Sequence, residues 1–244
     1  MTKNVILFSR IKSFIPALFM VIIYFTTVSA NAQDDPVINY LQHTGDYAEI
    51  YNGKMEAVYN IMQYKSFPYY MNSDFTEASI IYKNIYYPNQ KVRLDLFKEQ
   101  VILLPPEKQF GIILSFQNVE KVNMYNKTFV RMIPPKESGL KQGYYIQLLG
   151  NEKMQLYCKV YFNLVQKDVI YYGFERGIRY YLLYNNRYYP VKNKGSFTKL
   201  FPQYKKQINK YSKDNKLNFK QNTDESLISL AGYCEELVTS TNKQ

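Results

Sequence analysis

The chain has 244 residues and a formal net charge of +11, with 31 basic residues against 20 acidic ones. Hydrophobic residues make up 46% of it, which is enough for a folded core and excludes a wholly disordered chain. A single histidine and two cysteines exclude a multi-histidine or cysteine-rich zinc site. We therefore expect no metal site and no cofactor.

The first 32 residues have the pattern of a secretory signal peptide. A basic start precedes an apolar run from Phe14 to Val28, and Ala30-Asn31-Ala32 is the small-x-small pattern that signal peptidase cuts. The alternative is an uncleaved membrane anchor, but a spanning helix needs about 20 apolar residues. We expect export to the periplasm or the cell surface, with no transmembrane span after cleavage.

The residues after the signal favour strands. The chain contains 26 tyrosines and no tryptophan, and tyrosine suits half-buried pleated surfaces. MQLYCKVYF (154–162) and KVRLDLF (91–97) alternate between apolar and polar residues, and ASIIY, QVILL, KTFVRMI and GYYIQLL are further strand candidates. The breaks between such runs, NG, PNQ, PPEK, YNK and GNEK, are typical of an antiparallel meander.

The expected fold class is mainly β (α+β). An antiparallel β-meander, sandwich or partly open barrel should span residues 33–191, and a small helical segment at 192–244 should pack on it. After Val191 the apolar residues take helical spacing. We expect Ser196 to cap a short helix, Pro202 to open the next, and a last helix to begin at Asn222 or Thr223.

The stretch RYYLLYNNRYYPVKNKG (179–195) predicts a hairpin whose two-residue loop is Asn185-Asn186. This register places Tyr184 opposite Arg187, and cross-strand aromatic–aliphatic pairs would stabilise the hairpin. Both of its faces are aromatic, so one face should meet either the rest of the protein or a ligand. If a ligand binds, the candidate residues are Tyr181, Tyr184, Arg187 and Tyr188.

Positive charge is concentrated in one segment. Residues 192–220 contain nine lysines and one acid, Asp214. Such a segment could attract phosphorylated lipid, acidic polysaccharide or nucleic acid, although export argues against nucleic acid. The alternative is a solvated face of an amphipathic helix. The candidate basic patch consists of Lys205, Lys206, Lys210 and Lys213.

Cys158 falls on the apolar side of a predicted strand, and Cys234 falls on the apolar stripe of the last helix. In an oxidising compartment a disulfide could join them and stabilise the fold by about 2–5 kcal/mol. The alternative is two separate buried thiols, because free cysteine often packs as a small hydrophobic side chain.

Catalytic motifs are missing from the sequence: it has no nucleophile elbow, phosphate loop, dinucleotide-binding turn or calcium loop. Any histidine-dependent triad would have to use His43, and nothing near it supports one. A glycosidase needs only two carboxylates, and Asp95, Glu99 and Glu120 are available. We expect these acids to face solvent from their strands, so the sequence favours a protein without catalytic residues.

Several stretches together resemble uncharacterised secreted proteins of Gram-negative Bacteroidota. They are EIYNGKMEAVYNIMQYKSFPYY, the tyrosine-rich hairpin with the LFP and lysine-rich segment after it, and DESLISLAGYCEEL. The resemblance implies an envelope location and brings no activity or site residues with it.

The resulting hypothesis is a non-catalytic envelope or secreted protein that binds a glycan, a lipid or a protein partner. The alternative is a structural or assembly component that docks through its basic C-terminal helices. A hydrolase is the third, less favoured hypothesis.

Overall fold

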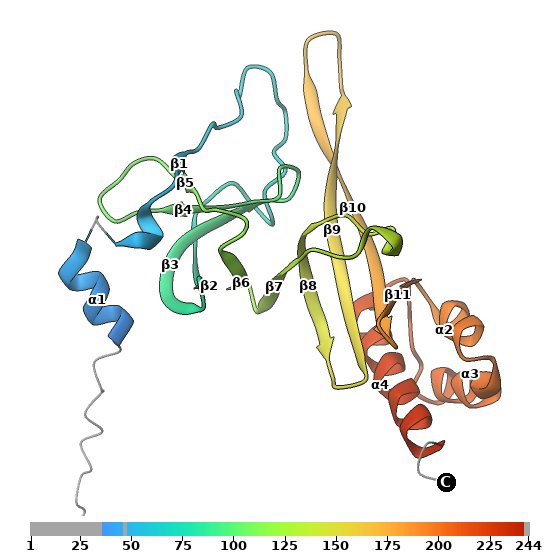
Figure 1. Ribbon diagram of the computed structural model, residues 1–244. Coiled ribbons are helices and arrows are strands. Elements are labelled where there is room, and N and C mark those ends of the chain that lie inside the picture. Colours follow the sequence, from blue (N-terminus) through green and yellow to red (C-terminus); the bar gives the residue numbers. More distant parts are fainter. Residues whose placement is uncertain (1–35, 46–47, 242–244) are drawn as a thin grey trace, which may run out of the picture. The chain divides into compact units, whose positions relative to one another are not determined.

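The computed structural model describes residues 36–45 and 48–241, so the predicted signal peptide lies outside the described residues. The fold is a single antiparallel sheet of 11 strands followed by a small helical segment, which confirms the predicted fold class (Figure 1). Its strands are β1 (Lys54–Met55), β2 (Thr76–Tyr82), β3 (Ile85–Asp95), β4 (Gln100–Leu104), β5 (Ile112–Ile113), β6 (Val119–Met124), β7 (Lys127–Met132), β8 (Gly143–Gly150), β9 (Met154–Gln166), β10 (Tyr172–Tyr184) and β11 (Arg187–Val191).

The helices stand at both ends of the described chain. They are α1 (Pro36–Thr44), α2 (Lys194–Leu200), α3 (Lys205–Asp214) and α4 (Thr223–Thr241), with short 3-10 turns η2 (Glu49–Tyr51), η3 (Lys136–Ser138) and η4 (Pro202–Tyr204). The spacing of apolar residues predicted the last three helices, whereas α1 was not predicted.

The strand order is β1-β5-β4-β3-β2-β6-β7-β8-β9-β10-β11. It consists of two meanders, β2–β5 and β6–β11, which are joined because β2 pairs with β6. The short strand β1 pairs with β5 at one edge. This arrangement brings β2, β3, β6 and β7 together in the middle of the sheet, although β3 and β6 are far apart in the sequence.

Two hydrophobic clusters form the main core. The first gathers buried side chains of the sheet, such as Leu94 and Phe129. The second joins β9–β11 to α2, α3 and α4, with Leu156 and Phe197 fully buried in it. The half-buried ring of Tyr180 packs against both clusters, so the helices and the sheet share one continuous interior.

The β10–β11 hairpin has the predicted register: Tyr184 pairs with Arg187, and Leu183 pairs with Tyr188. Its loop residues Asn185 and Asn186 have φ angles of 48° and 58°, the left-handed region that asparagine tolerates. The turn chemistry therefore determined the register, as the sequence indicated.

Two local predictions were wrong. The PNQ sequence (88–90) does not end a strand, because β3 runs through it with a register shift opposite Ala78–Ile80. Asn89 takes a φ of 53° there, so the chain forms a bulge instead of a break. The second wrong prediction is the cap of helix α2, which was expected at Ser196. The cap is Asn193, whose side chain accepts a hydrogen bond from the backbone N–H of Ser196.

The other helix signals hold. Pro202 opens η4 at its first position, where its missing N–H costs no hydrogen bond. Helix α4 begins at Thr223 with Asp224 and Glu225 in its first turn, where the helix dipole favours acids.

Candidate functional site

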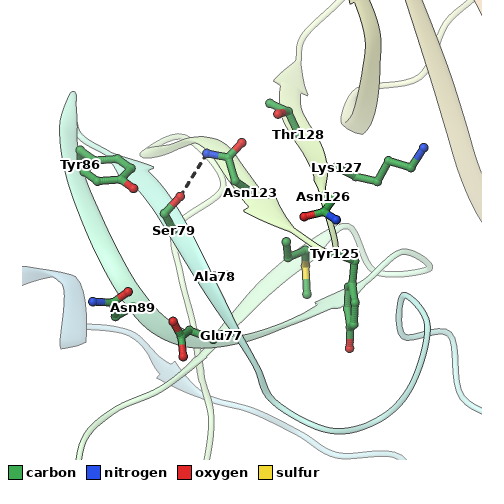
Figure 2. A pocket seen from close by; sticks show the side chains of 11 residues that line it. Glu77, Ala78, Ser79, Tyr86, Asn89, Asn123, Tyr125, Asn126, Lys127 and Thr128 are labelled. Carbon is green, nitrogen blue, oxygen red and sulfur yellow. Dashed lines mark hydrogen bonds between the residues drawn. The ribbon is translucent and has the colours of Figure 1, made fainter.

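A polar pocket of about 490 Å³ opens in the middle of the sheet, over β2, β3, β6 and β7 (Figure 2). Its lining residues are Glu77, Ala78, Ser79, Tyr86, Asn89, Asn123, Met124, Tyr125, Asn126, Lys127 and Thr128. The set is rich in amides and hydroxyls, and two tyrosine rings take part in it. We take this pocket, called the central pocket below, as the candidate site.

Unusual backbone geometry builds the rim of the central pocket. Tyr125 and Asn126 form the two-residue turn between β6 and β7, with φ angles of 50° and 54°. Asparagine adopts this conformation readily, but a tyrosine there costs about 1–2 kcal/mol. The bulge residue Asn89 adds a third left-handed residue on the β3 side. Such strain persists where the surroundings enforce it and often marks a functional site.

Contacts outside the pocket hold Tyr125 in place. Its ring packs edge-on against Tyr70, with the ring centroids 6.0 Å apart, and Tyr70 in turn packs on Phe129 of the core. The ring nevertheless remains 38% exposed. Tyr86 is 50% exposed and stands on β3 at the opposite side of the pocket (Figure 2). Two tyrosine rings are thus presented to solvent across a polar floor.

The polar side chains of the central pocket are largely available for a ligand. Asn123 donates a hydrogen bond from Nδ2 to Oγ of Ser79 at 3.1 Å, shown as the dashed line in Figure 2. Within the described part of the chain, the side chains of Glu77, Asn89 and Asn126 have no hydrogen-bond partner. Amide groups offer both donors and acceptors, and a carboxylate offers acceptors.

Lys127 stands at the edge of the central pocket but is already engaged. Its Nζ lies 3.3 Å from Oδ2 of Asp224, at the start of α4. The Asp224 carboxylate also accepts a hydrogen bond from the Tyr180 hydroxyl at 2.7 Å. Since this lysine is paired, the free charge in the pocket is the single carboxylate of Glu77.

The three carboxylates considered for glycosidase chemistry lie elsewhere. Asp95 is only 1% exposed, so the expectation that it faces solvent was wrong. Its side chain accepts hydrogen bonds from the Tyr59 hydroxyl and from the backbone N–H groups of Phe97 and Lys98. Burial raises the pKa of Asp95 above its ordinary value, although these hydrogen bonds oppose that shift.

Glu99 is half-buried, with 23% of its side chain exposed, and it forms an ion pair with Lys159 at 2.6 Å. Its other oxygen accepts a hydrogen bond from the backbone N–H of Tyr144. Burial raises the pKa of Glu99 and lowers that of Lys159. Glu120, by contrast, accepts a hydrogen bond from the backbone of Asn84 at the β2–β3 turn. Each of these acids thus serves a structural contact of its own.

The residues proposed for ligand binding on the β10–β11 hairpin divide between its two faces. Tyr181 and Tyr188 pack with the buried rings of Tyr145 and Tyr157. Tyr184 packs edge-on against Phe201, with the ring centroids 5.3 Å apart, on the face that meets the helices. Arg187 is exposed and pairs across the turn with Tyr184. Both aromatic faces therefore pack mainly against the protein.

The candidate basic patch lies on α3, and its four lysines are exposed. Lys210 forms an ion pair with Asp214 one turn later, at 2.8 Å. The other three, Lys205, Lys206 and Lys213, have no acidic partner among the described residues. The patch is therefore a real concentration of positive charge.

The structure contains the two cysteines as separate thiols, the second of the alternatives above. Cys158 is buried in the first core cluster and Cys234 in the second. Burial raises the pKa of each thiol to about 12, which keeps both protonated and poorly reactive.

His43 is exposed on α1 and its Nδ1 lies 2.8 Å from the backbone oxygen of Asn39. Within residues 36–45 and 48–241 there is no group of three or more histidine, cysteine or acidic side chains suited to a metal ion. None of the described helices has the length and apolar character needed to cross a membrane.

Comparisons with protein-family models, with curated proteins and with solved structures found no match to this chain. The sequence did not single out the residues of the central pocket, because they come from four strands and a turn, and no local motif connects them. The sequences PNQ and YNK were predicted only to separate strands. Each of them places an asparagine, Asn89 or Asn126, on the rim of the central pocket.

Proposed function

We propose that this chain is a non-catalytic module that binds carbohydrate in the central pocket. The observation that carries the proposal is the composition of that pocket: amide side chains and one carboxylate without partners, between two partly exposed tyrosine rings. Of the three ligand classes expected from the sequence, namely glycan, lipid and protein, this pocket composition favours glycan.

The chemistry of sugars fits such a site. Sugar hydroxyls both donate and accept hydrogen bonds, as do the amides of Asn89 and Asn126, and the Glu77 carboxylate accepts them. The apolar C–H faces of a sugar ring can rest on the exposed rings of Tyr86 and Tyr125. A few placed polar groups with aromatic surface are what a small-molecule site requires.

The pocket supports binding better than hydrolysis. Glycosidases use two carboxyl groups, about 5–9.5 Å apart. Among the described residues that line the pocket, only Glu77 carries a carboxylate. The remaining acids considered above are engaged in other contacts.

We place this function outside the cytoplasm. The support is the basic start, the apolar run and the small-x-small pattern of the first 32 residues. Mass spectrometry of the mature chain should find Gln33 as its first residue. A mature chain that retains Met1 and remains in the cytoplasm would remove this part of the proposal.

The binding test uses a panel of immobilised neutral and acidic oligosaccharides, followed by titration of the best binder. Tyr86→Ala removes an exposed ring, and Asn126→Gly removes an amide while keeping a residue suited to φ of 54°. Each change should weaken binding by about tenfold, or about 1.4 kcal/mol.

The matched control for this test is Asn186→Gly, the same substitution in another two-residue left-handed turn, remote in sequence from the pocket. It should bind like the unchanged protein. If the panel yields no binder, or if both pocket variants bind it with unchanged affinity, the carbohydrate proposal fails.

A second candidate is an assembly component of an envelope complex. The favouring observation is a group of exposed apolar side chains on two neighbouring segments, namely Val58, Ile61, Met62, Val169 and Ile170, with Val169 85% exposed. Backbone hydrogen bonds between Tyr172 and residues 63 and 65 join these segments. Exposed apolar side chains gathered on neighbouring segments are suited to a protein interface. Cross-linking in cells with and without Val169→Ser/Ile170→Ser tests this role: loss of a captured envelope partner supports it, and unchanged capture argues against it.

A further inference from the structure

A second recessed surface lies at the helical end of the chain, apart from the central pocket. Two adjoining hollows of about 710 Å³ and 450 Å³ share Asn193, Ser212, Lys213, Leu217 and Phe219. They form one groove between the β11–α2 connection and the α3–α4 connection, called the lysine groove below. Its lysines are Lys192, Lys194, Lys213, Lys216 and Lys220.

The positive charge of the lysine groove is uncompensated. None of its five lysines has an acidic partner among the described residues, and no acid lines the groove. The acids nearest in the chain are Asp214, paired with Lys210, and Asp224, paired with Lys127. Glu225 is exposed in the first turn of α4 and lines neither hollow. Like charges gathered in one hollow repel each other, so the groove favours an anionic ligand.

The lysine groove also contains a buried hydroxyl group, that of Ser212, without a partner among the described residues. Ser212 lines both hollows, is only 7% exposed, and its Oγ has no hydrogen-bond partner in the described structure. A serine inside a helix usually turns its hydroxyl to solvent or to the carbonyl four residues earlier. Buried polar groups are rarely left unsatisfied, and a hydroxyl without a partner can donate to a water or an ion.

The walls of the groove are held by backbone contacts. The N–H of Leu217 donates to the carbonyl of Ser212, and the N–H of Asn218 donates to the Ser226 hydroxyl. Lys216 takes a left-handed backbone with φ of 50° at the end of α3. The backbone of the groove is thus held in place before any ligand arrives, which reduces the ordering that binding would require. The remaining change is at Ser212, whose buried hydroxyl has to turn toward the ligand.

We propose that the lysine groove binds a phosphate-bearing ligand, with phosphoryl oxygens accepting from the Ser212 hydroxyl and from the ammonium groups of Lys213 and Lys216. Lysine binds phosphate as a compact point charge, and the five lysines of the groove call for a ligand that carries more negative charge than a single carboxylate. A phosphate monoester carries about −1.5 to −2 charges. Five lysines therefore match a ligand with more than one phosphate, and Leu217 and Phe219 offer apolar support for its carbon skeleton.

The site differs from the general basic patch of α3. Lys205, Lys206 and Lys210 line neither hollow, and the groove shares only Lys213 with the patch. Diffuse attraction would depend on the number of charges alone. A built site depends on where the charges lie and on the buried hydroxyl.

The test titrates the purified full chain with inorganic pyrophosphate at 0.15 M salt, by calorimetry. Ser212→Ala should lower the affinity by about tenfold, the loss expected for one hydrogen bond to a charged group. Its thermal stability should stay equal or rise, because no hydrogen bond of the folded protein is lost. Lys213→Ala/Lys220→Ala should abolish measurable binding.

The matched control is Lys205→Ala/Lys206→Ala, which removes the same charge from α3 outside the groove. It should bind pyrophosphate within twofold of the unchanged protein. Equal losses in the two double variants, or full affinity in Ser212→Ala, would overturn the proposal in favour of diffuse attraction. An absence of pyrophosphate binding would overturn it as well.

Competition then identifies the source of the phosphate. Phosphatidylcholine vesicles that contain phosphatidic acid should displace pyrophosphate if the groove accepts a lipid headgroup. If only soluble sugar phosphates displace it, the ligand is a free phosphorylated molecule. Either outcome supports the shared phosphate chemistry.

Discussion

At the scale of single residues, the ion pair of Lys159 and Glu99 shows how far this fold buries charge. Lys159 also donates to the carbonyl of Tyr144 and lies over the ring of Tyr145, 4.7 Å from its centroid. Gly143 has a φ of 151° and leaves no room for a Cβ beside Glu99. Lys159 is 9% exposed and Glu99 is 23% exposed at their side chains, so the loss of Lys159 would leave a largely buried carboxylate without its cation.

Lys159→Met should therefore lower the free energy of unfolding by about 3–5 kcal/mol. Adding Glu99→Gln should recover a large part of that loss, because glutamine is neutral and can still accept from the Tyr144 N–H. Urea unfolding of the two single variants and the double variant measures both effects. If Lys159→Met costs less than about 1 kcal/mol, the pair behaves like a surface salt bridge and its burial matters little.

Asp95 makes a pH-dependent contribution of defined sign. Burial raises its pKa in the folded state, so between its ordinary pKa of about 4 and the raised value the folded state holds more protons than the unfolded one. Its contribution to stability therefore falls as the pH rises through this window. In Asp95→Asn the side chain does not titrate, so its contribution to stability does not fall as the pH rises.

Unfolding free energies of the wild type and Asp95→Asn, measured at intervals from pH 3.5 to 7, check this sign. The stability of Asp95→Asn relative to the wild type should increase with pH above about 4. A constant difference would mean that the hydrogen bonds from Tyr59, Phe97 and Lys98 cancel the effect of burial on the pKa, and an opposite slope would mean that they outweigh it.

At the scale of elements, two-residue turns with left-handed backbone determine how the strands pair. The β6–β7 turn uses Tyr125-Asn126 and the β10–β11 turn uses Asn185-Asn186. The second was predicted together with its register, because two asparagines suit that turn. In the β6–β7 turn, Tyr125 takes a left-handed backbone conformation that tyrosine disfavours, and its ring lines the central pocket.

Asn186→Ala should destabilise the protein by about 1 kcal/mol, because alanine disfavours a φ of 58°. Asn186→Gly should be neutral or slightly stabilising, since Asn-Gly is the preferred pair for this turn. Chemical denaturation of both variants gives the comparison. Equal stabilities of the two would show that the backbone conformation of the turn contributes little.

At the scale of the whole molecule, the sequence predicted what depends on local periodicity. The alternation of residues 154–162 placed Met154, Leu156, Cys158, Val160 and Phe162 on one apolar face; the first four are buried and Phe162 is half-buried. The apolar stripe of α4 was found in the same way, since one face of a helix repeats at fixed spacing.

Features that depend on distant pairing could not be predicted. Lys159 lies on the nominally polar face of the same strand, yet it is buried because Glu99, 60 residues earlier, meets it there. The central pocket exists only because β2 pairs with β6, which brings Glu77 and Asn123 to one surface. Alternation along a strand carries no information about the partner strand, so these contacts required the structure.

Hydrogen–deuterium exchange, with and without a saturating concentration of the best oligosaccharide from the panel, tests whether carbohydrate binds in the central pocket. We predict slower exchange in residues 77–79, 86–89 and 123–128, which contribute to the central pocket, and unchanged exchange in the β10–β11 hairpin. Protection confined to residues 179–191, or no protection in the central strands, would contradict it.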